Sequence, residues 1–134
     1  MRVFVVVGVD FRTGAWQGFQ GKDVMAEIRF TKAVNVKKLG VSYLRDLNSW
    51  IFDPKSLRFE VSFDGKEFKE AFVHNFEALK LESDEKKITN FEKGVNYSSV
   101  KCVRVTVKNS GECPDWHKGK GNPSWLFLDE ILIE

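Results

Sequence analysis

Strict alternation of apolar and polar residues between positions 57 and 63 is the feature that most constrains how this chain can fold. A period of two is typical of a β-strand with one buried face and one solvated face. A shift of one residue would turn the whole apolar set to solvent, so the register is strongly specified. We therefore expect the core to contain Leu57, Phe59, Val61 and Phe63. Asp64-Gly65 follows and predicts a hairpin turn into another strand.

Further stretches repeat this β pattern. Alternation begins again at Val24 and at Val103, and a β-rich stretch runs from Val34 to Leu44. Residues 125–133 are apolar at both odd and even positions, which favours a central strand that is covered on both faces. Helical patterning is nearly absent, and residues 76–87 are compatible with a helical turn, a polar loop or an edge strand. Seven or eight short strands separated by turn residues predict an all-β antiparallel sandwich or barrel.

Length and charge restrict the class of protein. The chain has 134 residues, of which 43% are hydrophobic and 30% charged, and we expect residues 1–134 to form one globular domain. The net charge is 21 − 19 = +2, which gives no reason to expect nucleic-acid or membrane binding. The longest apolar run, Val3–Val7, is far short of a membrane span. That run ends at Asp10 without a small-residue cleavage site, so we expect no signal peptide in this sequence.

Two stretches outside the predicted strands combine aromatic, charged and amide side chains. The first, residues 44–54, contains Asp46, Asn48 and Trp50, and the second, residues 109–125, contains Asp115, Trp116 and His117. A flat ring can cover the apolar face of a pyranose, and planar polar groups can bond its hydroxyls. These loops are therefore candidates for carbohydrate recognition. The alternative is that each tryptophan folds back to close its own loop, and that the charged residues form surface ion pairs.

Several segments together carry a family resemblance. They read DFRTGAWQGFQG (10–21), SWIF (49–52), SFDG (62–65), RVTV (104–107), CPDWH (113–117) and WLFLDEI (125–131). Over about residues 10–134 the chain resembles the discoidin, or coagulation-factor type C, domains. More specifically, it resembles those at the C-terminal side of bacterial chitobiases and β-N-acetylhexosaminidases. The resemblance implies a galactose-binding-like jelly-roll β-sandwich.

The resemblance also implies a possible structural calcium ion. Related modules hold calcium with an acidic loop, a nearby threonine and a glutamate close to the C-terminus. Here Asp10, Thr13 and Glu130 are the corresponding oxygen donors, and Ca²⁺ requires six to eight of them. The usual Asp-Gly pair near the start is missing, because the stretch 2–9 reads RVFVVVGV.

The cysteines and histidines do not form a recognisable reactive or metal motif. Cys102, Cys113, His74 and His117 lack the paired short spacings of a zinc site, and no nucleophile with an orienting partner is apparent. A strand from Cys102 to Asn109 would advance about 23 Å, of which the four steps back to Cys113 recover at most about 14 Å. The remaining gap of about 9 Å exceeds the limit of roughly 7 Å for a disulfide. We expect two free thiols.

The resemblance, together with the two aromatic-polar loops, implies a non-catalytic carbohydrate-binding module of a glycosidase. We expect Arg12, the 44–54 stretch and the 109–125 stretch to meet at one end of the sandwich, since loops that precede strands of one direction gather there. The expected partners are a glycan with N-acetylhexosamine or galactose and the catalytic domain of a parent glycosidase. The expected form is a monomer, in a periplasmic, cell-surface or secreted chain. One alternative is a structural module that packs against that catalytic domain. The other is a free-standing hydrolase, which no recognisable pair of catalytic carboxylates supports.

Overall fold

The computed structural model of the protein describes residues 2–3 and 17–134. The predictions made for Asp10, Arg12 and Thr13 lie outside the described residues. The strands are β1 (Arg2–Val3), β2 (Gln17–Gln20), β3 (Val24–Asp46), β4 (Ser56–Ser62), β5 (Lys69–Asn75), β6 (Lys86–Lys108) and β7 (Trp125–Ile133), and a 3₁₀ turn spans Leu47–Ser49. The predicted all-β class is confirmed. No helix in this part of the chain has the length and apolar character needed to cross a membrane.

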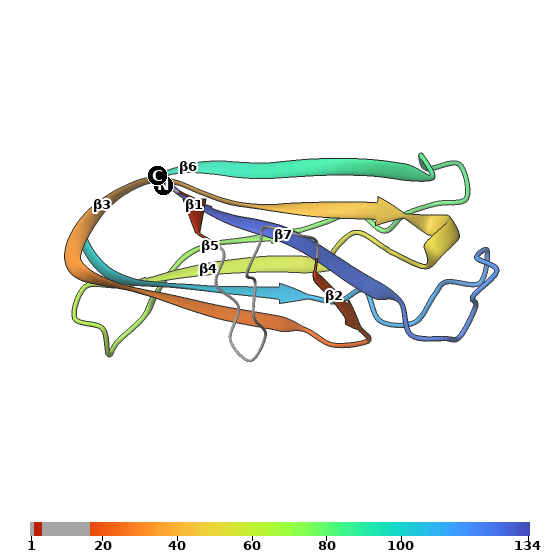
Figure 1. The fold of residues 1–134 in the computed structure, drawn as a ribbon, viewed down its shortest axis with the longest axis horizontal. Coiled ribbons are helices and arrows are strands. Elements are labelled where there is room, and N and C mark those ends of the chain that lie inside the picture. The colour runs from red at the N-terminus through yellow and green to blue at the C-terminus, as the bar shows by residue number, and fades with distance from the viewer. Residues whose placement is uncertain (1, 4–16) are drawn as a thin grey trace.

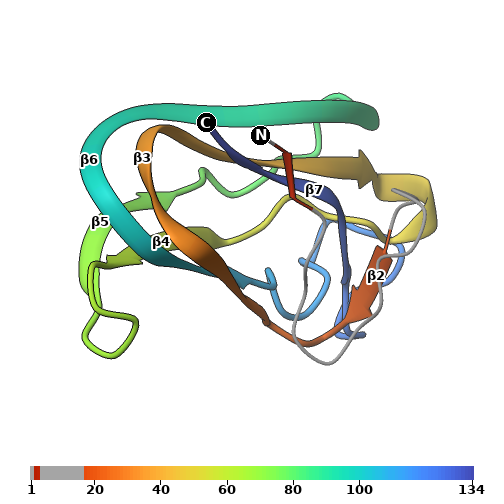
Figure 2. The same ribbon diagram turned by 60° about the vertical axis from the view of Figure 1, so that its left-hand side comes forward.

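Two long antiparallel strands, β3 and β6, form the frame of the fold. Each has 23 residues, and they pair from Val24↔Val107 to Asp46↔Lys86. Three register shifts interrupt the ladder between Arg29 and Lys38, and there both strands bend sharply, at the left of Figures 1 and 2. Bulges let strands bend without abandoning their pairing. The two β stretches predicted at 24–30 and 34–44 are therefore halves of one strand.

The bend divides the strands into two facing layers (Figures 1 and 2). One layer contains the second half of β3, the first half of β6, and β7 with β1 and β2. The other contains the first half of β3, the second half of β6, β4 and β5. An apolar core fills the space between them. β7 lies between β3 and the pair β1 and β2, so its predicted central position is confirmed.

The strand predicted from strict alternation is present, with one error at its end. Leu57, Phe59 and Val61 are each 0% exposed, whereas Phe63 is 45% exposed. The strand ends at Ser62, whose buried hydroxyl bonds Asp64 in the following turn. The prediction for Phe63 is wrong because the turn interrupts the alternation there. Its ring instead lies 6.3 Å from that of Tyr97.

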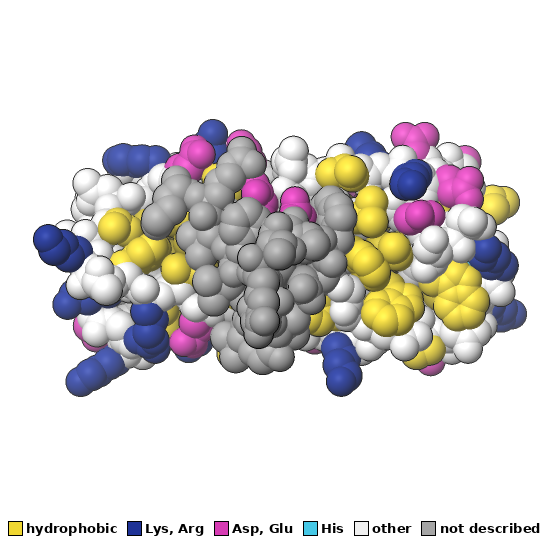
Figure 3. All heavy atoms as spheres, viewed as in Figure 1, with side chains coloured by type: hydrophobic (Ala, Val, Ile, Leu, Met, Phe, Trp, Pro, Cys, Tyr) yellow, Lys and Arg dark blue, Asp and Glu magenta, His cyan; other side chains and the backbone are white. Residues whose placement is uncertain are grey.

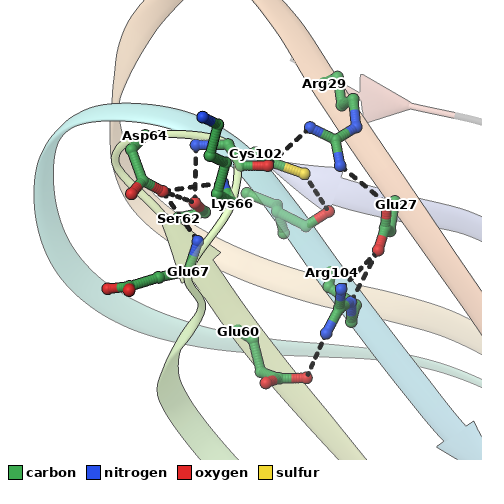
Figure 4. A network of polar contacts seen from close by, with 11 residues as sticks. Glu27, Arg29, Glu60, Ser62, Asp64, Lys66, Glu67, Cys102 and Arg104 are labelled. Carbon is green, nitrogen blue, oxygen red and sulfur yellow. Dashed lines mark hydrogen bonds and ion pairs between the residues drawn. The ribbon is translucent and has the colours of Figure 1, made fainter.

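The turn after β4 is held by one carboxylate (Figure 4). Oδ1 of Asp64 accepts hydrogen bonds from the backbone N–H groups of Lys66 at 2.8 Å and Glu67 at 2.9 Å, and from the hydroxyl of Ser62 at 3.0 Å. These bonds favour the ionised form and lower the pKa of Asp64 to about 2, the Glu67 bond having the largest effect. Arg29 connects this turn to β3 by donating to the carbonyl of Gly65 at 2.9 Å.

A second set of polar contacts joins β3, β4 and β6 on the outer face of the layer that contains β4 and β5 (Figure 4). Arg104 of β6 lies 2.7 Å from Glu27 of β3 and 3.9 Å from Glu60 of β4. The hydrogen bond from Arg104 is the main cause that lowers the pKa of Glu27. The guanidinium also lies 3.7 Å from the centre of the Phe68 ring. Alternation along these strands thus places apolar residues inside and paired charges outside.

The first half of β6 was not predicted as a strand. Its residues are largely polar, and Ile88 is 60% exposed. Among the described strands this half pairs with β3 alone, so it forms an edge. Helix, loop and edge strand were left open for residues 76–87; residues 76–85 form a loop, and 86–87 begin β6.

The contrast between Phe59 and Phe63 is testable. We expect Phe59→Ala to lower the free energy of unfolding by about 3–5 kcal/mol, because it leaves a cavity in a fully buried site. Phe63→Ala removes the same atoms from an exposed position, so its expected cost is about 1 kcal/mol or less. Urea unfolding of both variants checks this. Equal losses would contradict the strand boundary at Ser62.

Candidate functional site

Three loops meet at one end of the sandwich, on the right in Figure 1, and we call this the loop end. They are the β3–β4 loop (47–55), the β5–β6 loop (76–85) and the β6–β7 loop (109–124). The backbone N–H of Leu47 donates to the carbonyl of Glu85 at 2.9 Å, which joins the first two loops. The hydroxyl of Ser110 donates to the carbonyl of Asp53 at 2.5 Å, which joins the first and third. The two aromatic-polar loops singled out in the sequence therefore lie together.

A mostly buried ion pair lies beneath these loops. The guanidinium of Arg45, near the end of β3, donates two parallel hydrogen bonds to Asp53, Nε to Oδ1 at 2.8 Å and Nη2 to Oδ2 at 2.7 Å. The two side chains are only 12% and 10% exposed. Nη1 also donates to the carbonyl of Asp84 at 3.2 Å. The bond to Asp53 is the main cause that raises the pKa of Arg45. Arg45 thus joins the β3–β4 loop to the β5–β6 loop.

His117 connects the β6–β7 loop to the β3–β4 loop. The imidazole is buried and its two nitrogens both have backbone partners. The N–H of Gly119 donates to Nδ1 at 2.9 Å, so Nδ1 is an acceptor. Nε2, 2.6 Å from the carbonyl of Leu47, then carries the hydrogen and donates it. This geometry assigns the polar atoms of His117 to holding the loops together.

Trp50 lies in a strained backbone conformation. Its φ of 65° is in the left-handed region, where a bulky residue is rare. The strand-like pairing of Asp46 with Ile51 and the bond from the N–H of Trp125 to the carbonyl of Trp50, 2.8 Å long, hold it there. A Cβ at Gly119 would lie 2.9 Å from the Trp50 ring, so glycine is required for this approach. Trp50 therefore packs against the β6–β7 loop, whereas the structural alternative had it closing its own loop.

Trp116 differs from Trp50 because it borders open space. It lines a hollow of about 390 Å³ together with Asn48 and Lys118, which we call the Trp116 hollow. The β5–β6 loop contributes Leu81, Ser83 and Glu85 to its lining. The Trp116 ring is half-buried and rests against Phe52, with the ring centres 6.1 Å apart. The hollow thus combines a supported indole with amide, ammonium and carboxylate groups.

The remaining predicted residues take different positions. The Oδ1 atom of Asn48 accepts a hydrogen bond from Lys118 at 2.6 Å. Asp115 is almost fully exposed and lies 3.7 Å from Lys120. Asp46 ends β3 and accepts a bond from the Ser49 hydroxyl at 3.3 Å. Of these, Asn48 lines the Trp116 hollow.

A second hollow of about 290 Å³ lies at the loop end. Phe52 and Lys55 of the β3–β4 loop, Leu79 of the β5–β6 loop, and Glu112 and Pro114 of the β6–β7 loop contribute to its lining. We call it the Phe52 hollow. Sequence reasoning missed the β5–β6 loop, which borders both hollows. The available signal was the apolar pair Leu79 and Leu81 within an otherwise charged stretch.

Both cysteines are free and buried, so the predicted absence of a disulfide is confirmed among residues the structure describes. Burial raises the pKa of each thiol. Cys113 packs with Leu47 and Phe52 in a small apolar cluster under the loops. A Cβ at Gly119 would lie 3.2 Å from its sulfur, which shows how tightly this cluster is packed.

Of the three predicted calcium ligands, Glu130 lies among the described residues. Glu130 lies half-buried in β7, and its neighbour Asp129 has a buried carboxylate oxygen, Oδ1, that finds no hydrogen-bond partner among the described residues. Burial of such an atom is costly, and a hard cation would satisfy it. Asp10 and Thr13 lie outside the described residues. Within residues 2–3 and 17–134, no three or more His, Cys, Asp or Glu residues form a potential metal-binding group.

Figure 3 shows hydrophobic side chains at the surface on both sides of the grey atoms, including a group on the right-hand half of this face, towards the loop end. The tryptophans at 50, 116 and 125 are each half-buried. Exposed rings beside polar groups are characteristic of ligand-binding surfaces.

Comparison with known proteins bears on the fold. The sequence matches no protein-family model, and no curated protein matches it. Among solved structures, it is similar to the third CBM32 module of a family 31 glycoside hydrolase from Clostridium perfringens. The TM-score is 0.52 at 14% identity, over 99% of this chain and 90% of that chain. The fold is a galactose-binding-like β-sandwich. The discoidin-like architecture implied by the sequence is thereby confirmed, and the chitobiase context stays a prediction.

A weaker similarity is found to the K2 cleaved adhesin domain of Lys-gingipain. The TM-score is 0.43 at 13% identity, over 84% of this chain and 62% of that chain. A likeness of this size does not establish a shared fold.

The ion pair between Arg45 and Asp53 gives a prediction about the stability of the site. Arg45→Met leaves the Asp53 carboxylate buried without its partner, so we expect the free energy of unfolding to fall by about 3 kcal/mol. Arg58→Met is the matched control, because Arg58 and Glu70 pair at the surface with both side chains 55% exposed. Its expected cost is less than about 1 kcal/mol. Denaturant titration compares them, and similar small losses would refute the role of Arg45.

Proposed function

We propose that this chain is a non-catalytic carbohydrate-binding module. The observation that carries the proposal is the half-buried indole of Trp116 beside an open hollow with polar groups on its walls. Sugars present both apolar C–H faces and hydroxyl groups, and this combination matches them. A rigid, supported ring also avoids much of the entropy cost of binding.

Each residue of the Trp116 hollow has a distinct part in the proposal. Trp116 supplies the stacking surface. Asn48 and Lys118 are already bonded to each other, so they present a fixed pair of polar groups to sugar hydroxyls. Asp115 precedes Trp116 in the chain, and its exposed carboxylate, 3.7 Å from Lys120, would accept a hydrogen bond from a sugar hydroxyl. His117 and Trp50 support the loops that form the site, and the role of Arg12 and of Asp46 in binding stays a prediction.

The biological context belongs to the same proposal. The similar solved structure is described as a module of a glycoside hydrolase, which supports an accessory role in a glycosidase. We propose a parent enzyme of the β-N-acetylhexosaminidase or chitobiase type and ligands with N-acetylhexosamine or galactose. The module would then act outside the cytoplasm, in a periplasmic, cell-surface or secreted chain, and as a monomer. A role without catalysis agrees with the lack of an evident carboxylate pair in the sequence.

A second candidate function is packing against the parent's catalytic domain. Leu81 borders the Trp116 hollow and is 72% exposed, and Ile88 at the start of β6 is 60% exposed. Exposed aliphatic side chains favour a protein interface. Glycan binding by the isolated chain separates the two functions, because a surface used only for domain packing would bind no sugar.

We expect Trp116→Ala to weaken the binding of N-acetylglucosamine or galactose. The parent affinity should be weak, on the order of 0.1–1 mM, because a small sugar buries little area. Loss of a stacking ring worth about 1 kcal/mol corresponds to about a fivefold rise in Kd. Calorimetric titration measures it. Phe63→Ala serves as control, since it removes an exposed ring at the other end of β4. Unchanged binding by the Trp116 variant would eliminate the stacking assignment.

A structural calcium ion held by Glu130, with Asp10 and Thr13, remains part of the proposal. The buried Oδ1 of Asp129, which has no hydrogen-bond partner in the part of the chain that the structure describes, fits the same donor chemistry. When bound, the ion would stabilise the native state by mass action. We therefore expect a chelator to lower the melting temperature and added CaCl₂ to restore it. Glu130→Gln should remove this response. A melting temperature that changes with neither the chelator nor added CaCl₂ would count against any calcium site.

A further inference from the structure

The Phe52 hollow has no part in the function proposed so far. We propose that it is a second sugar subsite, so that the ligand is an oligosaccharide with one residue in the Trp116 hollow and the next in the Phe52 hollow. This inference rests on the proposed function and specifies its ligand.

The two hollows are neighbours because the same loops build both. Each of the three loops of the loop end lines both hollows. Phe52 borders one and Trp116 the other, and their ring centres are 6.1 Å apart. Leu79, which lines the Phe52 hollow, packs on the same apolar cluster as Trp116. A ligand that extends by one ring from Trp116 along this cluster would reach the second hollow.

The chemistry of the Phe52 hollow also suits a sugar. Phe52, Phe76 and Leu79 provide apolar surface. Lys55 and Glu112 are exposed at its edge, and neither side chain forms an ion pair with any other described residue. An ammonium donor and a carboxylate acceptor beside an apolar floor can bond hydroxyl groups while a pyranose face contacts the floor.

The volumes favour one sugar residue in each hollow. Pockets that bind small molecules usually measure about 300–1,000 Å³. The two hollows, at about 290 Å³ and 390 Å³, each lie at the lower limit of that range. Together they fall well inside it, as a site for a ligand of two or more rings would.

The walls of the Phe52 hollow are fixed before a ligand arrives. Asp53, which lines it, is held by Arg45 and by the bond from Ser110 to its carbonyl. The N–H of Phe76 donates to the carbonyl of Lys55 at 3.1 Å, which joins two of its sides. A preformed subsite spares the cost of ordering loops on binding, so a second sugar ring should add affinity.

The test compares sugars of different length on the whole chain. The probes are N-acetylglucosamine with chitobiose and chitotriose, and galactose with lactose, titrated by calorimetry. We expect a disaccharide of the series that binds to have a Kd at least about tenfold lower than its monosaccharide. Equal Kd values for both would overturn the second subsite while leaving the module function intact. Absence of binding by every probe up to about 10 mM would instead refute the proposed function, and the subsite with it.

A blocking variant locates the effect. Ala78 lines the Phe52 hollow and is exposed, so Ala78→Trp should fill the hollow. We expect it to bring disaccharide Kd values to within about twofold of the monosaccharide value and to leave monosaccharide binding unchanged. Thr31→Trp, on an exposed residue at the bend of β3, is the control and should change neither. An Ala78 variant that still prefers the disaccharide overturns the assignment.

A second, smaller substitution guards against misfolding of the tryptophan variant. Glu112→Ala removes one carboxylate at the edge of the Phe52 hollow and leaves the core untouched. We expect a severalfold rise in the disaccharide Kd with no change for the monosaccharide. Equal weakening of both sugars, with an unchanged melting temperature, would show that the two hollows are not separate subsites and would overturn the proposal.

Discussion

The loop end depends on the ion pair between Arg45 and Asp53. The guanidinium reaches both carboxylate oxygens, and the same side chain bonds the carbonyl of Asp84. The backbone carbonyl of Asp53 in turn accepts a hydrogen bond from the hydroxyl of Ser110. One pair of mostly buried charges therefore positions three loops that come from distant parts of the chain. Since a buried charge without its partner is strongly destabilising, the arrangement of these loops is tightly constrained.

The aromatic residues of the loop end divide into supporting and accessible rings. Trp50 is packed over Gly119, and His117 uses both nitrogens to join two loops. Their interactions are satisfied within the protein. Trp116 rests on Phe52 and still borders a hollow. The support given by the first group fixes the ring that is proposed to contact sugar, so stability and binding have a common structural origin.

Much of the frame could be predicted from the sequence, because alternation at 57–61 and 103–107 specifies which face each side chain takes. The meeting of the loops around Trp50 and Trp116 was also predicted correctly, from the antiparallel direction of the strands. The first half of β6 was missed, since an edge strand with polar residues lacks a clear period. The part played by the β5–β6 loop was missed as well, because its position depends on contacts with Arg45 and Leu47 rather than on its own residues.

By itself, the sequence determined the all-β class, the buried face of β4 up to Val61, the free cysteines, and the two aromatic-polar loops. These follow from local periodicity and chain geometry. Only the tertiary structure decided that two predicted β stretches form one bent strand, that Phe63 is exposed, and that Trp50 and His117 support the site. It also decided that the same three loops line two hollows. Such outcomes depend on which distant residues pack together, and a pattern within one segment carries no information about its partners in space.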